Sequence, residues 1–328
     1  MNPIRLAVIG CGSFGKNHLR TAAANPGVKL THAVDTDPAR AAEAAARYNC
    51  GAAARWQDLP GHIDAAIVAT PTVTHAEIAT GLVGAGIDVL VEKPIAATTA
   101  EAAAMIDAAR ANARVLHTGH LERFNPAILA LADTVNLPLF FEIHRMNAFA
   151  PRSLDVDVVL DLMIHDIDLV LGFTGEAPSE VRAAGVRILS QKVDIANVRL
   201  AFPSGCVANL TASRVSTEKI RKLRLFQPHQ YISIDYGRQD GVVITVDDKQ
   251  QIAFRQLATG PDKREPLAAQ LDAFLRAVAA RDLAPASANG AARALAVCEE
   301  ILARIEEHGA VVHRTLEARH VADDGPRS

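Results

Sequence analysis

Two different rhythms of apolar and polar residues divide the chain near residue 120. In the first part, short apolar runs alternate with alanine-rich stretches of helical spacing. Such alternation is typical of a doubly wound parallel sheet, an α/β fold of the Rossmann type, whose ligands bind at the carboxyl ends of the strands. The predicted strands are Ile4–Ile9, Lys29–Val34, Ala65–Ala69, Asp88–Val91 and Arg114–Thr118, and the predicted helices are Ser13–Ala24, Pro38–Tyr48, Ala76–Gly84 and Ala100–Ala111.

The second part begins with a helix that is apolar on most faces, from about Val156 to Phe173. Seven strand-like runs follow, joined by short turns such as Pro203-Ser204-Gly205, which predicts an α+β domain with a large open, mostly antiparallel sheet. Two helices and about a dozen frayed polar residues should close the chain. The runs are Val181–Leu189, Ala196–Phe202, Val207–Ser213, Lys222–Phe226, Gln230–Asp235, Val242–Val246 and Gln251–Gln256, and the helices are Lys263–Arg281 and Ala291–His308. We therefore predict two domains, residues 1–121 and 122–328.

The bulk composition narrows the class of protein. A length of 328 residues fits about two domains, and 49% apolar residues supply a sizeable core. The net charge of −3 gives no reason to expect a nucleic-acid or membrane partner, and the amino-terminal residues lack the pattern of a signal peptide. The four cysteines are scattered without a CxxC pair, so we expect a cytoplasmic protein with no disulfide framework and no bound metal.

A glycine-rich motif lies between the first predicted strand and the first predicted helix. Its sequence is Gly10-Cys11-Gly12-Ser13-Phe14-Gly15, with GxGxxG spacing. In a dinucleotide fold the first glycine permits the tight turn, the second lets the backbone approach a pyrophosphate, and the third lets helix and strand pack closely. The helix N-terminus then holds the phosphates, so the motif predicts a dinucleotide site that includes Ser13 and Phe14.

An acidic residue follows at the spacing expected for ribose binding. Asp35 ends the second predicted strand, twenty residues after Gly15. A carboxylate there can accept hydrogen bonds from the ribose hydroxyls and repels a 2′-phosphate, so the sequence favours NAD over NADP as cofactor. The alternative is that Asp35 caps the next helix, although Asp37, just before Pro38, is the better placed of the two for a cap.

Two further turns follow predicted strands at the same edge of the sheet. The segment VATPTVTH ends a strand at a proline turn, and Thr70, Pro71 and His75 are predicted to line the cofactor site. An ordinary turn with Thr74 as the helix cap remains the alternative. The next strand is followed by Glu92-Lys93-Pro94, which places an ammonium group at the ligand edge, where a solvated surface lysine is the alternative.

The apolar helix of the second part carries an unusual row of polar residues. At helical spacing, Asp157, Asp161, His165 and Asp168 fall within a stripe of about 80°, and Asp166 falls on the other side. Buried carboxylates need partners, which here could be a ligand, a metal or a structural hydrogen-bond network. No further Cys/His cluster supports a metal.

Together these motifs resemble the Gfo/Idh/MocA oxidoreductases over nearly the whole chain, from Ile4 to about His308. The resemblance rests on GCGSFG, VATPTVTH, EKP and DLMIHDID. It implies that Lys93, Asp161 and His165 are the catalytic Lys, Asp and His of that family, and that NAD and a sugar-like alcohol are the ligands. Where the family often has glycine this chain has Met163, which we expect to narrow the pocket.

A finer resemblance is to members that act on nucleotide sugars. The segments GHLERFNP and LFQPHQY are similar to those of UDP-N-acetylglucosamine 3-dehydrogenases, which oxidise the C3 hydroxyl to a ketone. Arg123 follows the last Rossmann strand and could contact a substrate hydroxyl or phosphate; an exposed salt bridge is the alternative. Dehydrogenation of free sugars or inositols, and a non-catalytic NAD-sensing regulator, remain the rival functions.

The expected chemistry is proton abstraction coupled to hydride transfer. An imidazole titrates near neutral pH, so His165 is the predicted base, Asp161 its orienting partner, and Lys93 the group that stabilises the developing oxyanion. Lys93 and His165 could exchange roles. We also predict a homodimer or homotetramer, because an open sheet leaves one face uncovered and the runs Ala196–Phe202 and Val207–Ser213 are apolar.

Overall fold

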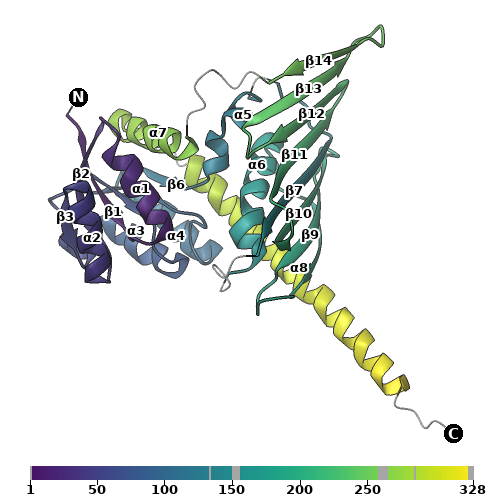
Figure 1. The fold of residues 1–328 in the computed structure, drawn as a ribbon, viewed down its shortest axis with the longest axis horizontal. Coiled ribbons are helices and arrows are strands. Elements are labelled where there is room, and N and C mark those ends of the chain that lie inside the picture. The colour runs from purple at the N-terminus through teal and green to yellow at the C-terminus, as the bar shows by residue number, and fades with distance from the viewer. Residues whose placement is uncertain (1, 133, 150–155, 258–264, 284–285, 324–328) are drawn as a thin grey trace. The chain divides into compact units, whose positions relative to one another are not determined.

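The computed structural model describes residues 2–132, 134–149, 156–257, 265–283 and 286–323. The chain forms two compact units (Figure 1). The first contains Met1–Pro126 and Gly260–Leu295, and the second contains Ala127–Thr259 and Ala296–Ser328. The single cut predicted after residue 121 therefore does not describe the packing, because a carboxyl-terminal segment returns to the first unit.

The first unit is built on six parallel strands in the order β3-β2-β1-β4-β5-β6. This is the strand order of a doubly wound dinucleotide fold, with its switch point between β1 and β4. The central strands are apolar on both faces because helices cover both sides of the sheet. The strands are β1 (Ile4–Ile9), β2 (Val28–Val34), β3 (Gly51–Ala53), β4 (Ala65–Val68), β5 (Asp88–Val91) and β6 (Leu116–Thr118).

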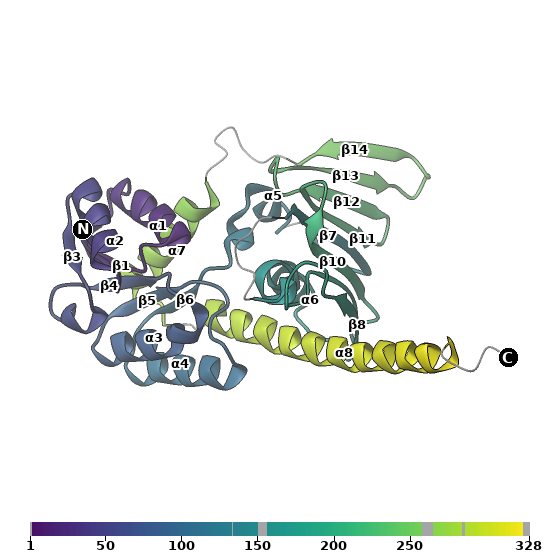
Figure 2. The ribbon, with the colours of Figure 1, turned by 60° about the horizontal axis from the view of Figure 1, so that its bottom comes forward.

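Helices α1, α2 and α7 lie on one side of this sheet, and α3 and α4 lie on the other (Figure 2). Three side chains of α7, Leu271, Phe274 and Leu275, pack into the same core as Leu6 and Leu19. The helices are α1 (Ser13–Ala23), α2 (Pro38–Tyr48), α3 (His75–Gly84), α4 (Thr99–Ala111) and α7 (Pro266–Ala280), with 3₁₀ turns η1 (Trp56–Asp58), η2 (Thr72–Thr74) and η3 (Leu121–Phe124). The predicted start of α7 at residue 263 lies outside the described residues.

The second unit is built on eight strands in the order β14-β13-β12-β11-β7-β10-β9-β8. All neighbours are antiparallel except β7 and β10, which are parallel. Seven of the strands match predicted runs; the central strand β7 was missed. The strands are β7 (Phe140–Ala148), β8 (Glu180–Val186), β9 (Ile195–Ala201), β10 (Val207–Ser216), β11 (Ile220–Gln227), β12 (Gln230–Asp235), β13 (Asp240–Val246) and β14 (Ile252–Gln256).

One face of the large sheet is apolar and packs against helix α6 (Ile164–Thr174) (Figure 2). Phe141 of β7 stacks on Phe173 of α6, with ring centroids 6.2 Å apart. The outward face differs from the prediction at β9 and β10, where most of the apolar residues point inward and the middle of the outward face is polar. These outward residues hydrogen-bond across the strands as Asn197 with Thr211 and Arg199 with Asn209.

The predicted apolar helix exists, but its first turn is not an α-helix. Residues Val159–Met163 form a π turn, η4, in which the Ile164 N–H donates to the Val159 carbonyl, and α6 follows directly. π turns occur mostly as single insertions at functional sites. Met163, which we expect to narrow the pocket, is fully buried.

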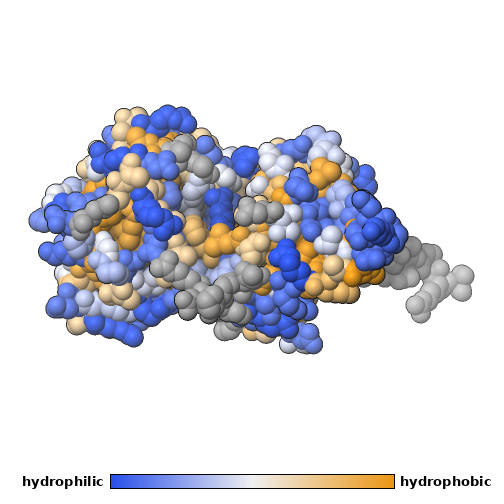
Figure 3. Space-filling view, turned by 90° about the horizontal axis from the view of Figure 1, so that it is seen from above, coloured by the Kyte–Doolittle hydropathy of each residue, from blue (hydrophilic) through white to orange (hydrophobic). Residues whose placement is uncertain are grey.

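The carboxyl-terminal helix is longer than predicted. Helix α8 spans Ala286–Asp323, so residues 317–323 are helical where we expected fraying, and residues 324–328 lie outside the description. The short helix α5 (Pro126–Leu129) completes the helices of the described residues. Within these residues, no helix has an apolar stretch that could cross a bilayer. Polar and apolar side chains are interspersed on the face drawn in Figure 3.

Candidate functional site

The glycine-rich loop forms an open cradle at the carboxyl end of β1. Gly10 has φ +95°, and a Cβ there would lie 2.4 Å from the Ala69 carbonyl oxygen. A Cβ at Gly15 would lie 1.8 Å from the Gly10 carbonyl oxygen, so both glycines are required by close backbone packing. Gly12, by contrast, has no atom within 4 Å of the place its Cβ would take. No side chain caps α1, which leaves the N–H groups of its first turn available to an anion.

Asp35 lies at the end of β2 beside this loop. Its carboxylate is buried and accepts the Cys11 N–H at 2.9 Å through Oδ2 and the Asp37 N–H at 2.9 Å through Oδ1. Asp35 is therefore held in place by the loop, while each oxygen keeps a second lone pair. Asp37, the better placed of the two acids for a cap, is the cap of α2 and accepts the Ala39 N–H at 2.9 Å.

Arg40 and Cys11 complete the surroundings of Asp35. The Arg40 Nε donates to Asp37 at 3.0 Å, and its Nη1 lies 3.8 Å from Asp35 Oδ1, so two carboxylates balance this cation. Burial, and next the Asp35 carboxylate, raise the pKa of the Cys11 thiol to about 11. The thiol in the phosphate loop is therefore neutral and is no nucleophile at physiological pH.

Buried His75 connects the two turns that follow β4 and β5. Its Nε2 lies 2.9 Å from the Thr70 carbonyl oxygen and its Nδ1 lies 2.9 Å from the Pro94 carbonyl oxygen. Burial lowers the pKa of His75, so the ring is neutral and has one N–H for two carbonyls. Thr70 also accepts the Thr74 hydroxyl at 2.8 Å. Any influence of His75 on a cofactor would pass through these turns, since both ring nitrogens face the backbone.

Glu92 links the same region to α1. Its Oε1 lies 2.7 Å from Nε2 of His18, and its Oε2 accepts the Lys93 N–H at 3.1 Å. Both side chains are buried, and a Cβ at Gly119 would lie 2.7 Å from the carboxylate, so only glycine fits opposite it. Sequence reasoning missed His18, because nothing local marks its pairing with a residue 74 positions away. Lys93 itself is half-buried beside this link.

The structure thus brings most predicted cofactor residues to one edge of one sheet. Gly10, Gly12 and Gly15 follow β1, Asp35 follows β2, Thr70 and Pro71 follow β4, and Glu92 and Lys93 follow β5. A cradle with open space at Gly12, uncapped helical N–H groups and a carboxylate at the ribose position fits a dinucleotide.

The predicted catalytic pair Asp161 and His165 lies in the second unit. Asp161 is within the π turn η4 and His165 is in the first turn of α6, and both side chains are half-buried. The remaining acids of the helix have other environments. Asp166 forms a buried two-point ion pair with Arg145 of β7, with N–O distances of 2.8 and 2.7 Å, and Asp168 is buried. Asp157 precedes the π turn and accepts the Val193 N–H at 2.8 Å.

Arg123 is on η3, and its guanidinium lies against Gly290 of α8 within the first unit. A Cβ at Gly290 would be 2.4 Å from Nη2 of Arg123. Burial lowers the pKa of His117 in β6; the Asp282 charge opposes this, and the Arg123 charge adds to it. The predicted contact of Arg123 with substrate stays a prediction.

Two family descriptions match this chain. The first, an oxidoreductase family with an NAD-binding Rossmann fold, matches residues 4–120. The second, the GFO/IDH/MocA carboxyl-terminal domain, matches residues 137–230. Together they cover both units and agree with the fold expected from the motifs.

The individual proteins that this chain resembles are dehydrogenases. The chain is 38% identical over 314 residues to a UDP-N-acetylglucosamine 3-dehydrogenase from Acidithiobacillus ferrooxidans, covering 92% of this chain and 97% of the relative. A solved structure of that enzyme superimposes with a TM-score of 0.87 at 36% identity, over 94% of this chain and 99% of the other. An inositol 2-dehydrogenase from Saccharopolyspora erythraea is 30% identical over 53% of this chain and 54% of its own length. A levoglucosan dehydrogenase structure, at 21% identity and a TM-score of 0.81, shares the fold.

Proposed function

The chain belongs to the Gfo/Idh/MocA family of oxidoreductases, which have an NAD-binding Rossmann fold, and from that premise we propose that it oxidises a ring hydroxyl of a nucleotide sugar to a ketone. The proposed substrate is UDP-N-acetylglucosamine, and the proposed position is its C3 hydroxyl. The observation that carries this proposal is the 38% identity to an enzyme of that activity over 92% of the chain. Relatives named inositol dehydrogenases match shorter parts of the chain at lower identity, which makes inositols the second substrates to test.

The proposed cofactor is NAD rather than NADP. The Asp35 carboxylate is fixed by two backbone N–H groups and would repel a 2′-phosphate. Arg40 is the cation best placed to attract that phosphate, but Asp37 and Asp35 already balance its charge. The N–H groups at the start of α1 would hold the pyrophosphate beside Gly12.

We assign the chemical roles to Lys93, Asp161 and His165. Bound NAD would accept a hydride from the carbon that carries the hydroxyl. His165 would take the hydroxyl proton on an imidazole nitrogen, and Asp161, four residues earlier, would orient the ring and stabilise its charged form. Lys93, at the end of β5, would stabilise the negative charge that develops on the oxygen.

We also propose a cellular compartment and an oligomeric state. All four cysteines lie within the described residues and form no disulfide, which supports the cytoplasm as the place of action. We also propose that the protein self-associates into a dimer or tetramer.

The test is a substrate screen followed at 340 nm, where NADH absorbs. UDP-N-acetylglucosamine, other UDP-sugars, free N-acetylglucosamine and myo-inositol are each supplied with NAD or NADP. We expect the highest kcat/KM with UDP-N-acetylglucosamine and NAD, and a 3-keto product by mass spectrometry. Faster turnover of a free sugar or inositol would contradict the nucleotide-sugar proposal. Tight NADH binding with no turnover of any compound would favour the regulator.

A further inference from the structure

A buried carboxylate organises the loop between β8 and β9 in the second unit. Asp194 is fully buried, and its Oδ2 accepts the backbone N–H groups of Ile188, Leu189 and Ser190 at 2.7, 2.6 and 2.9 Å. Its Oδ1 accepts the Ser190 hydroxyl at 2.6 Å. Four donors from one short loop therefore converge on a single side chain, which fixes the path of residues 188–193.

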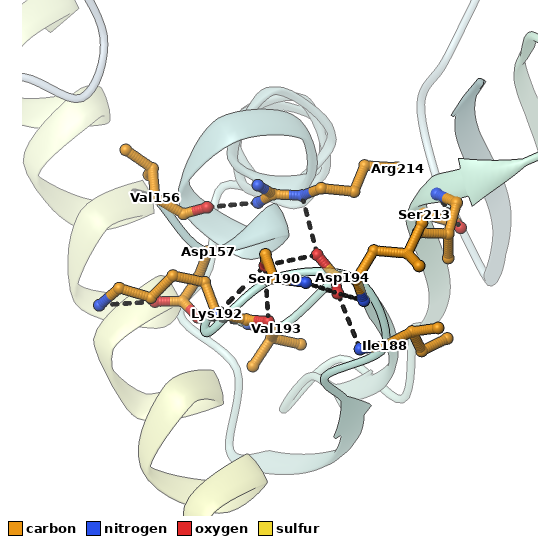
Figure 4. Close-up of polar contacts among 11 residues, drawn as sticks. Val156, Asp157, Ile188, Ser190, Lys192, Val193, Asp194, Ser213 and Arg214 are labelled. Atoms are coloured by element: carbon orange, nitrogen blue, oxygen red, sulfur yellow. Dashed lines mark hydrogen bonds and ion pairs between the residues drawn. The ribbon is translucent and has the colours of Figure 1, made fainter. Parts of the chain in front are cut away.

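Arg214 of β10 joins this loop to the segment that leads into the catalytic helix (Figure 4). Its backbone N–H donates to the Asp194 carbonyl at 2.9 Å, and its Nε lies 3.8 Å from Asp194 Oδ1. Its Nη2 donates to the Val156 carbonyl oxygen. The guanidinium is nearly as buried as the carboxylate, so one cation bridges an anion on one side and a backbone carbonyl on the other.

The loop and the segment are also joined directly. The Val158 N–H donates to the Val193 carbonyl at 2.9 Å, and the Val193 N–H donates to Asp157 Oδ1 at 2.8 Å. Asp157 then accepts the Asp161 N–H through its backbone carbonyl at 3.0 Å. Hydrogen bonds and the covalent chain between them thus connect Asp194 with the backbone of Asp161.

This connection reaches the helix at its N-terminal end, where the helix's own hydrogen bonds hold the backbone least firmly. The first N–H groups of any helix lack intrahelical partners, and here the helix begins with the irregular bonding of a π turn. A small shift of residues 156–158 would move the backbone of Asp161 and the first turn of α6, which carries His165. Groups in chemistry of this kind tolerate little displacement.

We propose that Asp194 and Arg214 are positioning residues, which fix the π turn and the first turn of α6 and so place Asp161 and His165 for the reaction. This inference rests on the proposed roles of Asp161 and His165. It extends them to two residues that lie outside the predicted site and that the motifs of the family resemblance do not include.

The variants are chosen to weaken these hydrogen bonds without leaving a cavity in the core. Asp194→Asn keeps an acceptor oxygen for the three N–H groups of the loop but turns an NH₂ group toward Arg214. Arg214→Lys keeps the positive charge but lacks the planar fork that reaches two acceptors. Val198→Ala, in the interior of β9, is the control for a general loss of stability in the same unit.

Two measurements are made on each full-length variant at a temperature well below its unfolding. In hydrogen exchange, peptides covering 156–165 should exchange faster in Asp194→Asn and Arg214→Lys but not in Val198→Ala. In steady-state assays, the two variants should lose about 10- to 100-fold in kcat, the usual scale for misplaced catalytic groups. The KM for NAD should change less than about twofold, since interactions removed only from the transition state lower kcat. Val198→Ala should retain kcat.

Each outcome decides the matter. Unchanged exchange over 156–165, or faster exchange with unchanged kcat, overturns the proposal, as does an equal loss of kcat in Val198→Ala at matched stability. If Asp194→Asn does not fold, Arg214→Lys and Asp157→Asn are judged by the same criteria. If the wild-type protein turns over no nucleotide sugar, the proposed function fails, and the exchange result alone accepts or rejects the positioning role.

Discussion

Gly12 is the residue at which a small change should affect the cofactor most selectively. Its backbone has φ −68°, which other residues adopt, and the direction of its Cβ is open. The Gly12→Val protein should therefore fold, but the valine side chain would fill the space proposed for the pyrophosphate. We expect Gly12→Val to weaken NADH binding by about 100-fold or more, a loss of roughly 2.7 kcal/mol, in a fluorescence titration.

The control for this prediction is another glycine of the same unit. Gly84, near the end of α3, also has open space around its Cβ, and Gly84→Ala should bind NADH like the wild type. Wild-type affinity in a folded Gly12→Val protein would mean that this loop is not the phosphate cradle.

The three assigned catalytic residues should affect turnover rather than cofactor binding. His165→Ala, Asp161→Asn and Lys93→Met should each lower kcat by about 100-fold or more, the scale of a positioned acid–base or oxyanion group. NADH affinity should remain near that of the wild type for His165→Ala and Asp161→Asn, because both residues belong to the unit without the glycine-rich loop. Near-normal kcat in any one of them would remove that residue from the proposed chemistry.

Asp166, which helical spacing places on the side opposite the polar stripe, belongs to a buried ion pair in the structure. Its carboxylate is 1% exposed and pairs with Arg145, whose guanidinium also lies 5.1 Å from the Tyr236 ring centre. Asp166→Asn removes the charge that pairs with a buried arginine at two points, so we expect a loss of about 3–5 kcal/mol in the free energy of unfolding, measured in urea.

The matched variant replaces both partners. Asp166→Leu with Arg145→Met removes both charges and should be more stable than Asp166→Asn. A loss below about 1 kcal/mol in Asp166→Asn would indicate that the pair is accessible to water in solution.

For single residues, the sequence predicted the contacts made between residues close together in the chain and missed those made between residues far apart. The turn at the glycine motif, the place of Asp35 at the end of a strand and the helix cap at Asp37 were predicted because they depend on spacing within one strand–helix unit. The pairs His18–Glu92 and Arg145–Asp166 were missed because their partners lie 74 and 21 residues apart and meet only after the sheets have formed.

Among the elements, strand β7 shows why a pattern can fail at the centre of a sheet. Its inward residues are Phe141, Ile143 and Arg145, and all three are buried. The arginine breaks the apolar alternation by which a strand is recognised, and its charge is buried in an ion pair with Asp166 of α6. The other seven strands of the large sheet were predicted within a few residues of their bounds, whereas the short edge strand β3 of the first unit was also missed.

The helix that begins at η4 shows a second way in which a prediction from the sequence pattern can fail. Its existence and burial followed from its apolar composition, but the stripe of four polar residues assumed a constant turn per residue. The π turn at Val159–Met163 changes that angle, and Asp157 falls outside the helix, where it binds the β8–β9 loop. Hydrophobic spacing cannot reveal an extra residue in one turn.

The β8–β9 loop should make stability depend on pH. Burial tends to raise the pKa of Asp194, but hydrogen bonds from the Ser190 hydroxyl and three backbone N–H groups outweigh it and lower the pKa from 3.8 to about 2. A lowered folded-state pKa stabilises the protein above about pH 4, and that contribution is lost as the pH falls toward about 2.

Asp194→Asn has no carboxyl group to titrate at this place. Urea unfolding at several pH values between about 6 and 2.5 should therefore show a smaller acid destabilisation for Asp194→Asn than for the wild type. Parallel curves for the two proteins would assign the acid sensitivity to other carboxyl groups.

On the scale of the whole molecule, the outward face of the large sheet carries a row of apolar side chains. Phe140, Phe226, Tyr231, Ile244 and Phe254 are cross-strand neighbours on five adjacent strands. The Phe226 ring centroid is 5.7 Å from that of Phe140 and 5.0 Å from that of Tyr231, and Phe254 is 71% exposed. This row, rather than β9 and β10, is now the basis for expecting self-association.

Light scattering at micromolar concentration should give at least a dimeric mass for the wild type. Phe226→Glu with Phe254→Glu should lower it to that of one chain, because charges would be buried at the interface. Val186→Glu, which changes an exposed apolar residue on β8 at the far edge of the sheet, should leave the mass unchanged. A monomeric wild type would reject the prediction.

The division of the chain has a consequence for how the protein is made. The ribosome delivers residues 1–126 first, but Leu271 and Phe274, which fill the core beside Leu6 and Leu19, arrive roughly 145 residues later. At about 5–20 residues per second, the unfinished nucleotide domain waits about 7–30 seconds with the apolar surface that α7 covers still exposed. During that interval the nascent chain exposes apolar surface that a chaperone could bind, and a transcript truncated before residue 266 would yield a product with this surface permanently open.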